Sequence, residues 1–328
     1  MKKNTSWVLL VGGAGYVGTQ MAYTLLESGY AVMVVDNLSR DAHPHLPKEV
    51  VLHQIDIKDA EKLDAVFSKY DISCVMDFSA FIHVGESMQW PDYYYQNNVF
   101  YTLNLLMAMK KHGVRYLLFS SSAAVFGEPT YLPVNEAHPK NPMNPYGRSK
   151  WICEMILEDM RHAYGLCYGV LRYFNIAGAD PEGRSGFCER DATNLIPIIL
   201  NGIFDEDQQL TVFGADYDTR DGTCLRDYIH VKDICLAQLA VMESMFLNDK
   251  SVIYNVGSGK GYTILEVIHA IQKITGKKVA YHLGERRDGD PARVIADISQ
   301  ISSDLDWLPQ HSDLDQMVGD AWQWITRA

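Results

Sequence analysis

The chain has 328 residues, and its 41 Asp and Glu against 29 Lys and Arg give a net charge of −12, which argues against generic nucleic-acid binding. With 47% hydrophobic and 21% charged residues, it has the composition of a globular protein of about two domains, which excludes disordered and fibrous classes. No run of roughly 18 apolar residues occurs, so no membrane-spanning helix is expected.

The six cysteines form no CxxC pair and no short-spaced Cys/His cluster. We therefore expect reduced, mostly buried thiols, no metal site and a cytoplasmic protein. Lys2 and Lys3 followed by apolar residues superficially resemble a signal peptide, but cleavage there would remove the glycine-rich segment that comes next. A buried first strand is expected instead.

Strand and helix patterns alternate through the first half of the chain. An apolar run at residues 7–11 precedes the glycine-rich residues 12–18, a helical stretch at 19–28 and a second strand at 31–35 that ends at Asp36. Strand, helix and strand within about 30 residues form a βαβ unit. Further strands are expected at 50–54, 74–78, 116–120 and 168–173, and helices at 58–69 and 94–111.

After about residue 175, Gly and Pro punctuate shorter elements: helices at 193–203, 231–245, 264–275 and 314–326, and strands at 210–213 and 252–256. Continuous apolar strands in the first half indicate a parallel sheet covered on both faces. The predicted fold is therefore α/β, a Rossmann-type doubly wound parallel sheet with a smaller mixed α/β C-terminal domain. We place a cofactor domain at 1–174, to which later segments can return, and a substrate domain at 175–328.

Gly12, Gly15 and Gly18 lie between the first strand and the first helix. This spacing lets backbone N–H groups and a helix N-terminus approach a pyrophosphate, which predicts a dinucleotide ligand. Asp36 follows about 20 residues later, where a carboxylate accepts from a ribose 2′-hydroxyl and repels a 2′-phosphate. NAD is therefore expected rather than NADP, although the Arg40 guanidinium could in principle bind a phosphate.

Tyr146 and Lys150 are spaced to share one helix face, and Ser122 ends the strand that begins at residue 116. An adjacent ammonium and a nicotinamide cation both favour a phenolate, so this spacing can make the tyrosine a proton acceptor, with Ser122 bonding the same substrate hydroxyl. Each residue taken alone is more often structural than catalytic. Their order behind a dinucleotide fold is what favours catalysis.

These motifs resemble the extended short-chain dehydrogenase/reductase family, nearly end to end. Within it, the chain is similar to enzymes that epimerise UDP-hexoses. That resemblance implies a tightly held NAD and inversion at C4 of UDP-glucose or UDP-galactose through a transient 4-keto sugar. The supporting stretches are GGAGYVG from Gly12, DNLS from Asp36, VGES from Val84, NNV from Asn97, FSSSAAVFG from Phe119, NPYGRSK from Asn144, LRYFNIAGA from Leu171, RDYIHV from Arg226 and RRDGD from Arg286.

The resemblance also implies the site residues. The catalytic set is Ser122, Tyr146 and Lys150. Cofactor contacts carry over to Gly12, Gly15, Tyr16, Val17, Gly18, Asp36, Asn37, Asp56, Ile57, Phe78, Asn97, Ser120, Tyr146, Lys150 and Phe174. Substrate contacts carry over to Ser122, Asn175, Asn194, Leu195, Arg226, Tyr228, Arg287, Asp290 and Val294. Arg226 and Arg287 can neutralise a diphosphate, and Asp290 can accept from ribose hydroxyls. Without the resemblance, surface ion pairs with Asp227 or Asp288 would be expected for these arginines.

The chain departs from the family at two positions. Ile82 stands where a lysine is usual, so either His83 or a backbone group substitutes, or NAD is held less tightly. Val294 stands where residue size gates the sugar 2-substituent and is smaller than the tyrosine of strict UDP-glucose enzymes. We therefore expect an N-acetyl group to fit, with some activity on UDP-N-acetylglucosamine.

Alternative functions remain open. A 4,6-dehydratase needs an extra acid/base pair, but Ala123 and Ala124 occupy the place of its Asp-Glu pair. An epimerase of UDP-glucuronate or a UDP-pentose would share nearly every site residue. A non-catalytic NAD sensor has no need for Ser122, Tyr146 and Lys150.

The resemblance further suggests a homodimer through helices 94–111 and 145–161. The first helix is apolar around most of its circumference, which burial within the monomer explains equally well. Its apolar residues are Leu103, Leu105, Leu106, Met107 and Met109.

Overall fold

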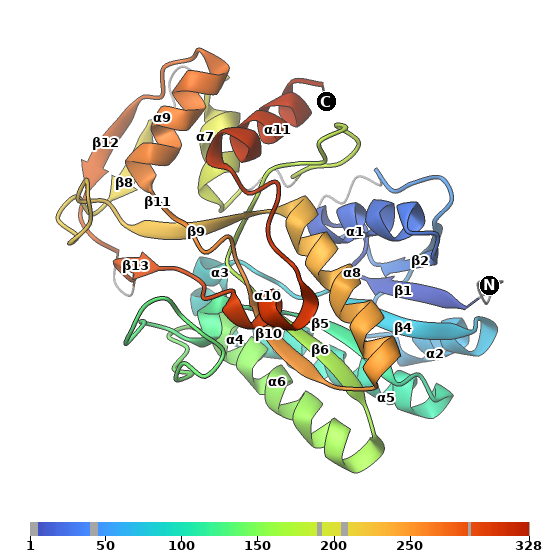
Figure 1. Ribbon diagram of the computed structural model, residues 1–328. Coiled ribbons are helices and arrows are strands. Elements are labelled where there is room, and N and C mark those ends of the chain that lie inside the picture. Colours follow the sequence, from blue (N-terminus) through green and yellow to red (C-terminus); the bar gives the residue numbers. More distant parts are fainter. Residues whose placement is uncertain (1–5, 40–44, 189–191, 205–208, 288–289, 328) are drawn as a thin grey trace. The chain divides into compact units, whose positions relative to one another are not determined.

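The computed structural model describes residues 6–39, 45–188, 192–204, 209–287 and 290–327. The chain divides into two compact units. Figure 1 shows the elements of both, with colours that follow the sequence. The first comprises Met1–Val125, Pro142–Arg172 and Cys235–Tyr254, and the second Phe126–Asn141, Tyr173–Ile234 and Asn255–Ala328. Both units are discontinuous in sequence: the predicted division at residue 174 allowed later segments to return to the first domain, as Cys235–Tyr254 does, but it did not place Phe126–Asn141 in the second. The binding roles assigned to those segments stay predictions.

The first unit is built on a seven-stranded sheet with the order β10-β6-β5-β4-β1-β2-β3. β1 pairs in parallel with both β2 and β4, and the β2–β3 and β4–β5 pairs are also parallel. The predicted doubly wound parallel sheet is therefore confirmed. The strands are β1 (Trp7–Val11), β2 (Ala31–Asp36), β3 (Val51–Gln54), β4 (Ile72–Asp77), β5 (Tyr116–Ser122), β6 (Cys167–Tyr173) and β10 (Val252–Val256).

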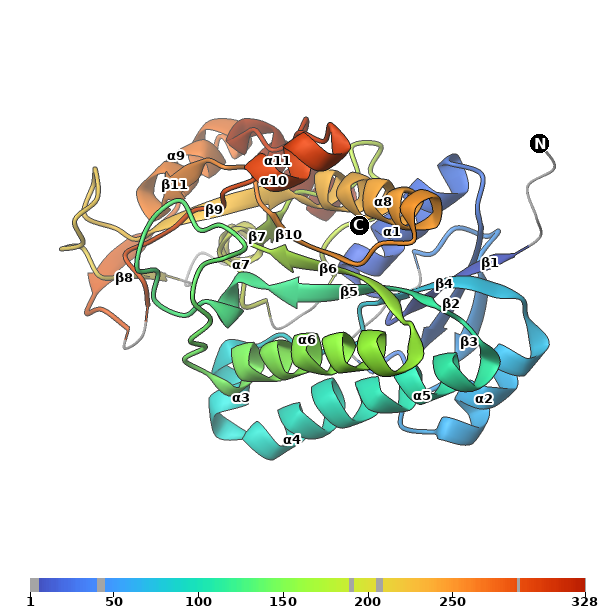
Figure 2. The ribbon, with the colours of Figure 1, turned by 60° about the horizontal axis from the view of Figure 1, so that its bottom comes forward.

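Helices cover both faces of this sheet because its strands are apolar on both sides (Figure 2). One face carries α2 (Ala60–Lys69), α4 (Pro91–Tyr95), α5 (Thr102–His112) and α6 (Pro145–Tyr164), with the short α3 (Val84–Gln89) beside them. The other carries α1 (Tyr16–Glu27) and α8 (Val231–Asn248), of which residues 235–248 belong to this unit. The strand order reverses at β1 and β4: β2 and β3 follow on one side, and β5 and β6 on the other. The carboxyl ends of β1 and β4 therefore form a topological switch point, where ligands bind in such sheets.

The predicted helix at 94–111 is interrupted. Between α4 and α5 lies a π-helix, η1 (Gln96–Tyr101), which the sequence pattern did not reveal. Its Asn97 donates from Nδ2 to the Ser79 carbonyl at 3.2 Å, and the Asn98 Oδ1 accepts from the Phe81 N–H at 2.8 Å. Single π-turns often occur at functional sites. Here the π-helix orients the side-chain amides of Asn97 and Asn98 toward the loop after β4.

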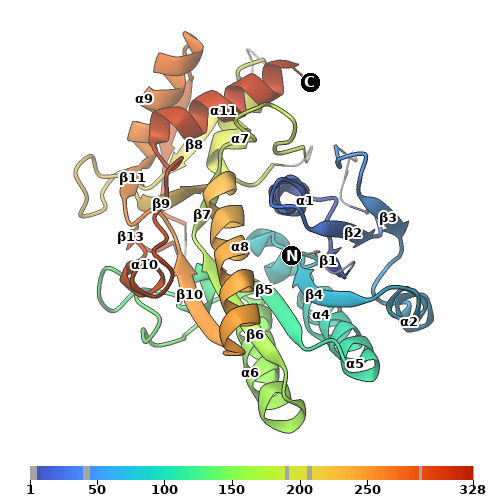
Figure 3. The same cartoon turned by 45° about the vertical axis from the view of Figure 1, so that its right-hand side comes forward.

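The second unit contains the predicted smaller mixed sheet. β9 (Leu225–His230) pairs antiparallel with β11 (Gly261–Thr263) and parallel with β13 (Arg293–Val294) and β7 (Asn175–Ala177). A second, parallel pair joins β8 (Leu210–Phe213) and β12 (Tyr281–Gly284). Figure 3 shows α7 (Leu195–Gly202), α9 (Ile264–Thr275) and α11 (Leu314–Arg327) side by side, and residues of all three helices pack in one apolar core. The unit also contains α10 (Ser299–Leu305).

A buried ion pair attaches α6 to the large sheet. The Arg172 guanidinium on β6 donates from Nη2 to Glu154 Oε2 at 2.6 Å and from Nε to Oε1 at 3.0 Å. Ser121 on β5 donates to the same Oε1 at 2.5 Å. Both charged side chains are only 2% exposed, so each depends on the other for compensation of its buried charge.

We expect Glu154→Ala to lower the free energy of unfolding by about 3–5 kcal/mol, because Arg172 is left as an unpaired buried cation. Denaturant unfolding followed by circular dichroism measures this loss. The control is Arg161→Ala on the same helix, whose pair with Glu158 is solvent-exposed and should contribute about 0–1 kcal/mol. Equal losses in the two variants would show that the buried pair does not anchor α6.

Candidate active site

The turn between β1 and α1 contains glycines that the protein's own packing requires. Gly12 has a positive φ of +70°, and a Cβ there would lie 2.7 Å from backbone atoms of Phe78 and Ser79. A Cβ on Gly18 would lie 2.6 Å from the Gly13 Cα. Side chains at positions 12 and 18 would therefore push the turn away from the strand end or the helix away from the turn.

Gly15 is different, because nothing in the described part of the protein requires a glycine there. Its φ of −75° suits any residue, and a Cβ would meet only the Gly12 carbonyl oxygen, at an ordinary 3.5 Å. Gly15 is the N-cap of α1, and the first turn of that helix, which begins with Tyr16 and Val17, has no acidic residue. A glycine at this place leaves the helix N-terminus open to the close approach of a phosphate group, which fits a dinucleotide.

The residues predicted at the adenosine end lie together. Asp36 accepts from the Ala14 N–H at Oδ2 (2.9 Å) and from the Leu38 N–H at Oδ1 (2.8 Å), which orients its carboxylate beside the glycine turn. Asn37 donates from Nδ2 to Asp56 Oδ2 at 3.1 Å. Arg40 lies outside the described residues.

Asp56 is held ionised beside these groups, and Ile57, also predicted here, is buried next to it. Partial burial raises the pKa of Asp56, but hydrogen bonds from the Lys58 backbone and Asn37 and the Lys58 charge together lower it below its usual value. A fixed pair of carboxylates suits the recognition of ribose and adenine hydrogen-bond donors.

The start of α6 is fitted closely to the end of β5. Asn144 caps the helix by accepting from the Gly147 N–H at 2.8 Å, and Pro145 occupies the first turn. A Cβ on Gly147 would lie 2.5 Å from the Ala124 carbonyl oxygen, so the 3-10 turn η2 (Ala123–Val125) rests directly on the helix. This contact brings Ser122 within hydrogen-bonding reach of the Tyr146 hydroxyl.

Burial raises the pKa of Tyr146, and the hydrogen bond with Ser122 lowers it by less. Lys150 is 3% exposed, and its Nζ donates to the Ser120 carbonyl at 2.6 Å. Burial lowers the pKa of Lys150 against the opposing charge of Asp77. Burial is therefore the larger of the two effects on the Tyr146 pKa. The expected effect of Lys150 on the phenolate stays a prediction.

Two predicted cofactor contacts lie around the loop after β4. Phe78 follows that strand directly, and its N–H donates to the Val11 carbonyl at 2.7 Å. Asn97 bonds the same loop from η1. Phe174 belongs to the second unit, where it is buried and donates to the Val256 carbonyl at 3.3 Å.

The departure at Ile82 leaves an apolar side chain that is 45% exposed. The His83 N–H donates to the Tyr94 hydroxyl at 2.9 Å, and that hydroxyl donates back to the His83 carbonyl at 2.8 Å. Both backbone groups of residue 83 are thus engaged. The alternatives stated for position 82 stay predictions.

In the second unit, Arg226 is held by three oxygen atoms. Its Nη1 donates to the carbonyls of Leu225 (3.0 Å) and Pro291 (2.7 Å), and its Nη2 donates to Asp290 Oδ1 (3.1 Å). Val294 on β13 stands directly opposite Arg226 in the register of β9. Three predicted substrate residues therefore lie together, and Arg226 pairs with Asp290 rather than with Asp227.

Other predicted substrate residues adjoin this group. Asn175 stands opposite Tyr228 in the β7–β9 register and donates from Nδ2 to the Asp227 carbonyl at 3.1 Å. Arg287 lies over the Phe213 ring with its guanidinium carbon 3.8 Å from the centroid, and its carbonyl accepts from the Asp290 N–H at 3.2 Å.

Asn194 and Leu195 stand apart from this group. Asn194 is the exposed N-cap residue of α7, and Leu195 packs on the apolar core below it. Among the described contacts, none joins either residue to Arg226.

Asp227 is a residue that sequence reasoning did not single out. It is completely buried and accepts from Ser258 N–H and Oγ (both 2.7 Å), Gly259 N–H (3.0 Å) and Ala296 N–H (3.1 Å). Burial raises its pKa to about 6 against these hydrogen bonds, which lower it. Asp227 thereby links β9 to Ser258 and Gly259 and to Ala296.

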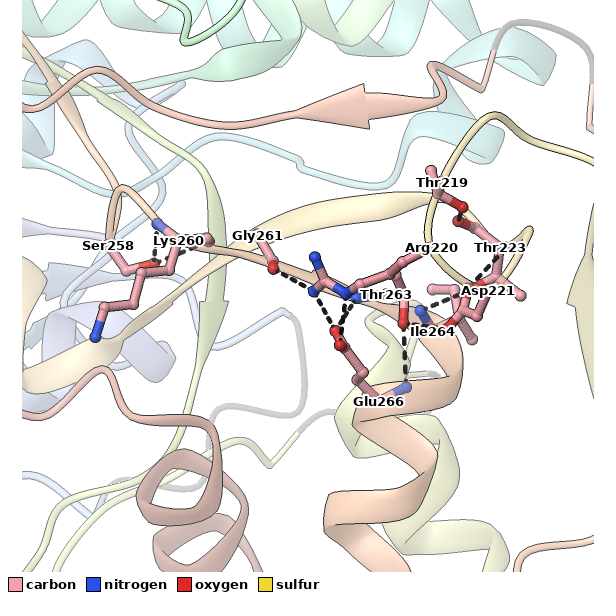
Figure 4. A network of polar contacts seen from close by, with 10 residues as sticks. All are labelled: Thr219, Arg220, Asp221, Thr223, Ser258, Lys260, Gly261, Thr263, Ile264 and Glu266. Atoms are coloured by element: carbon pink, nitrogen blue, oxygen red, sulfur yellow. Dashed lines mark hydrogen bonds and ion pairs between the residues drawn. The ribbon is translucent and has the colours of Figure 1, made fainter.

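The loop between β8 and β9 is anchored at the start of α9 (Figure 4). Arg220 pairs with Glu266 and donates to the Gly261 carbonyl at 2.8 Å, while Asp221 accepts from Thr223 and Thr263. Thr263 and Glu266 also form a capping box at this helix N-terminus. The network fixes the loop whose Tyr217 donates to the Asp290 carbonyl at 3.5 Å.

The six cysteines are all free, and five of them are buried. Within the described residues, no group of three or more His, Cys, Asp or Glu side chains is arranged to hold a metal ion. None of the described helices has the length and hydropathy that crossing a bilayer requires.

Comparison with known proteins gives consistent matches. The sequence profile of the "NAD dependent epimerase/dehydratase family" matches residues 8–257. A UDP-glucose 4-epimerase from Halalkalibacterium halodurans is 41% identical over 97% of this chain and 95% of its own. The UDP-glucose 4-epimerase of Brucella ovis, solved with NAD, has a TM-score of 0.94 and 39% identity over 97% of each chain. That of Bifidobacterium longum, solved with NAD+ and UDP, has a TM-score of 0.89 and 38% identity over 98% of each chain.

Gly15→Ala should weaken binding of the expected dinucleotide by about tenfold or more, or ~1.4 kcal/mol, while leaving the fold intact. The physical reason is that the methyl group meets no protein atom closely but stands where a phosphate must approach. Titration of NAD into cofactor-stripped protein measures the first effect, and denaturant unfolding the second.

Gly319→Ala in α11 is the matched control, since a Cβ there meets no atom within 4 Å and the position lies far from the glycine turn in sequence. It should bind NAD like the unmodified protein. Unchanged NAD affinity in Gly15→Ala would remove the ligand-based reason for that glycine.

Proposed function

Because the chain belongs to the NAD dependent epimerase/dehydratase family, we propose that it interconverts UDP-glucose and UDP-galactose by inverting C4 of the sugar, with NAD as cofactor. The observation that carries the proposal is the fit of α6 against β5, which joins Ser122 to Tyr146 and buries Lys150 against Ser120. All four residues stand at the carboxyl edge of the sheet that also carries the glycine turn.

Each residue of this set has a role in moving one proton. Tyr146, with Ser122 bonded to the same hydroxyl, takes the proton from the sugar 4-hydroxyl and later returns it. NAD, when bound, would supply the hydride acceptor and donor that inversion of C4 through a 4-keto sugar requires. Lys150 supplies a positive charge near the phenolate and a donor for the cofactor ribose.

The cofactor would be held by the residues that the glycine turn and Asp36 bring together. The helix N-terminus after Gly15 would face the pyrophosphate, Asp36 would accept from the adenosine ribose, and Asp56 and Ile57 would adjoin the adenine. Phe78, Asn97 and Ser120 follow the cofactor toward its nicotinamide end. In the second unit, Arg226 and Arg287 would neutralise the UDP diphosphate, Asp290 would accept from the uridine ribose, and Asn175, Asn194, Leu195 and Tyr228 would complete the UDP-sugar contacts.

Dehydration of the sugar is disfavoured by the residues in η2. Ala123 and Ala124 carry no acid or base for the elimination, and the Ala124 carbonyl is pressed against α6. Epimerisation of UDP-glucuronate or a UDP-pentose is a second candidate, because it would use the same catalytic set. Incubation with each UDP-sugar and chromatography of the products separates these activities from each other and from a non-catalytic NAD sensor.

A homodimer through α4–α5 and α6 is the proposed assembly. Phe100 at the end of η1, Met107 on α5 and Met155 on α6 are exposed although they are apolar. Such side chains on long helices favour burial against a second copy. We also propose action in the cytoplasm, where six free thiols remain reduced.

Tyr146→Phe should lower kcat for UDP-galactose conversion by about 10²–10⁴-fold, because the variant lacks the group that accepts the proton. The NAD content and the unfolding midpoint should stay unchanged. A coupled assay for UDP-glucose measures the rate. Tyr164→Phe, at the exposed end of the same helix, should retain full activity. Near-full turnover in Tyr146→Phe would exclude this tyrosine as the proton acceptor.

Val294→Tyr should abolish conversion of UDP-N-acetylglucosamine and retain that of UDP-glucose, because the larger ring would fill the space expected for the N-acetyl group. The measurement is kcat/KM for both substrates in the two proteins. If the unmodified protein converts UDP-galactose but not the N-acetylated sugar, the size argument at residue 294 is wrong.

A further inference from the structure

The described residues of the first unit bury four charged side chains, two cations and two anions. Lys150 and Arg172 are 3% and 2% exposed, and Asp77 and Glu154 are 3% and 4% exposed. Buried charges are costly unless an opposite charge lies close by. The pairing of these four charges therefore determines which of the side chains can stay ionised in their buried positions.

Arg172 and Glu154 satisfy each other. Two hydrogen bonds join them, and Ser121 adds a third to the same carboxylate. Arg172 engages both oxygens of the Glu154 carboxylate, and Glu154 opposes the effect of burial on the Lys150 pKa less than Asp77 does. Lys150 and Asp77 are the two buried charges that remain.

Asp77 ends β4, and the Lys150 Nζ on α6 lies against the neighbouring part of β5. Asp77 is the last residue of β4 and stands opposite Phe119 in the β4–β5 register. The Lys150 Nζ lies 4.8 Å from the centroid of that same Phe119 ring and donates to the next residue, Ser120. The two side chains form no direct ion pair among the described contacts, but the charge of Asp77 raises the pKa of Lys150 against the effect of burial.

Among the described contacts, only one oxygen of the Asp77 carboxylate accepts hydrogen bonds. Its Oδ1 accepts from the Ser79 N–H at 2.9 Å and the Ser79 Oγ at 2.6 Å. Its Oδ2 accepts no hydrogen bond from any described residue. A carboxylate with one oxygen oriented and the other unbonded, beside a buried ammonium, is well suited to balance that charge.

We propose that Asp77 is the counter-charge that keeps Lys150 an ammonium in its buried position, and that it is thereby a positioning residue for proton transfer at Tyr146. The second part rests on the proposed epimerase function, whereas the first does not. The other titratable groups near Lys150 are Tyr146, Cys153 and Glu154 on its own helix, with Arg172 neutralising Glu154 from β6. Burial raises the pKa of Cys153 to about 12, so its thiol stays neutral.

The catalytic part is tested by the pH dependence of kcat in Asp77→Asn, which keeps the shape and the acceptor for Ser79 but removes the charge. At the acid end of the profile, Lys150 should be protonated in both proteins and kcat should be similar. As the pH rises, Lys150 should lose its proton earlier in the variant. The loss of kcat should then grow with pH, to about tenfold or more at the alkaline end of the profile.

Asp71→Asn, at the exposed residue just before the same strand, is the matched control and should follow the unmodified profile. A loss of kcat in Asp77→Asn that is the same at every pH would indicate a structural role and overturn the proposed action on Tyr146. If Tyr146→Phe kept full activity, the proposed function would be wrong. The pairing of Asp77 with Lys150 would then be tested by the unfolding measurements alone.

The counter-charge itself is tested without activity, by a double-mutant cycle in denaturant unfolding with the NAD content of each sample measured. Asp77→Asn and Lys150→Met should each lower the unfolding midpoint, because each leaves one buried charge unmatched. The double variant should recover most of that loss, since both charges are then gone. Additive losses would overturn the proposal, and this readout holds even if Asp77→Asn is too unstable for kinetics.

Discussion

The arrangement of the candidate site depends on the buried pair of Arg172 and Glu154. Tyr146, Lys150 and Glu154 are spaced four residues apart on α6, so they share one face of the helix. Glu154 is fixed to β6 by two hydrogen bonds and to β5 by Ser121. Rotation or sliding of α6 would break this pair and leave two buried charges unmatched. The position of the phenol and the ammonium relative to β5 therefore follows from an interaction two turns further along the helix.

Close approach of backbone segments sets the other dimensions of the site. Gly12 lets the first turn rest on Ser79, and Gly147 lets α6 rest on Ala124, and both contacts are too short for any Cβ. Between them they fix the ends of β1, β4 and β5 relative to α1 and α6. Packing thus determines these two glycines, whereas the glycine at position 15 leaves room for a ligand. Packing therefore accounts for Gly12 and Gly147 but not for Gly15, for which the proposed dinucleotide is the remaining reason.

Most of the large sheet could be predicted from the sequence because its strands are continuous apolar runs. β1 and β10 have the expected ends, and the others differ by two residues or fewer. β9 was missed because Arg226 and Asp227 interrupt its apolar pattern, although Asp227 is completely buried. The placement of β10 beside β6 is a pairing between distant segments, which local periodicity does not contain. Tyr146, Lys150 and Ser122 could be selected by spacing and order. The burial of Asp77, Glu154 and Arg172 could not, since it arises only when β4, α6 and β6 pack.

The acidic composition of the chain is compatible with the proposed binding of two pyrophosphate groups, because each would be recognised locally. A guanidinium has five N–H donors, and Arg226 uses three on Leu225, Pro291 and Asp290. The two carbonyls are neutral, so they orient the group without cancelling its charge, and Asp290 cancels it only in part at a partly exposed position. In the described contacts, the remaining two donors bind no protein atom and are free for a phosphate. At the glycine turn, the N-terminus of α1 provides backbone donors without any side-chain charge. A net charge of −12 therefore opposes polyanions that contact the whole surface, but it has little effect on a diphosphate inside a site whose donors are already oriented.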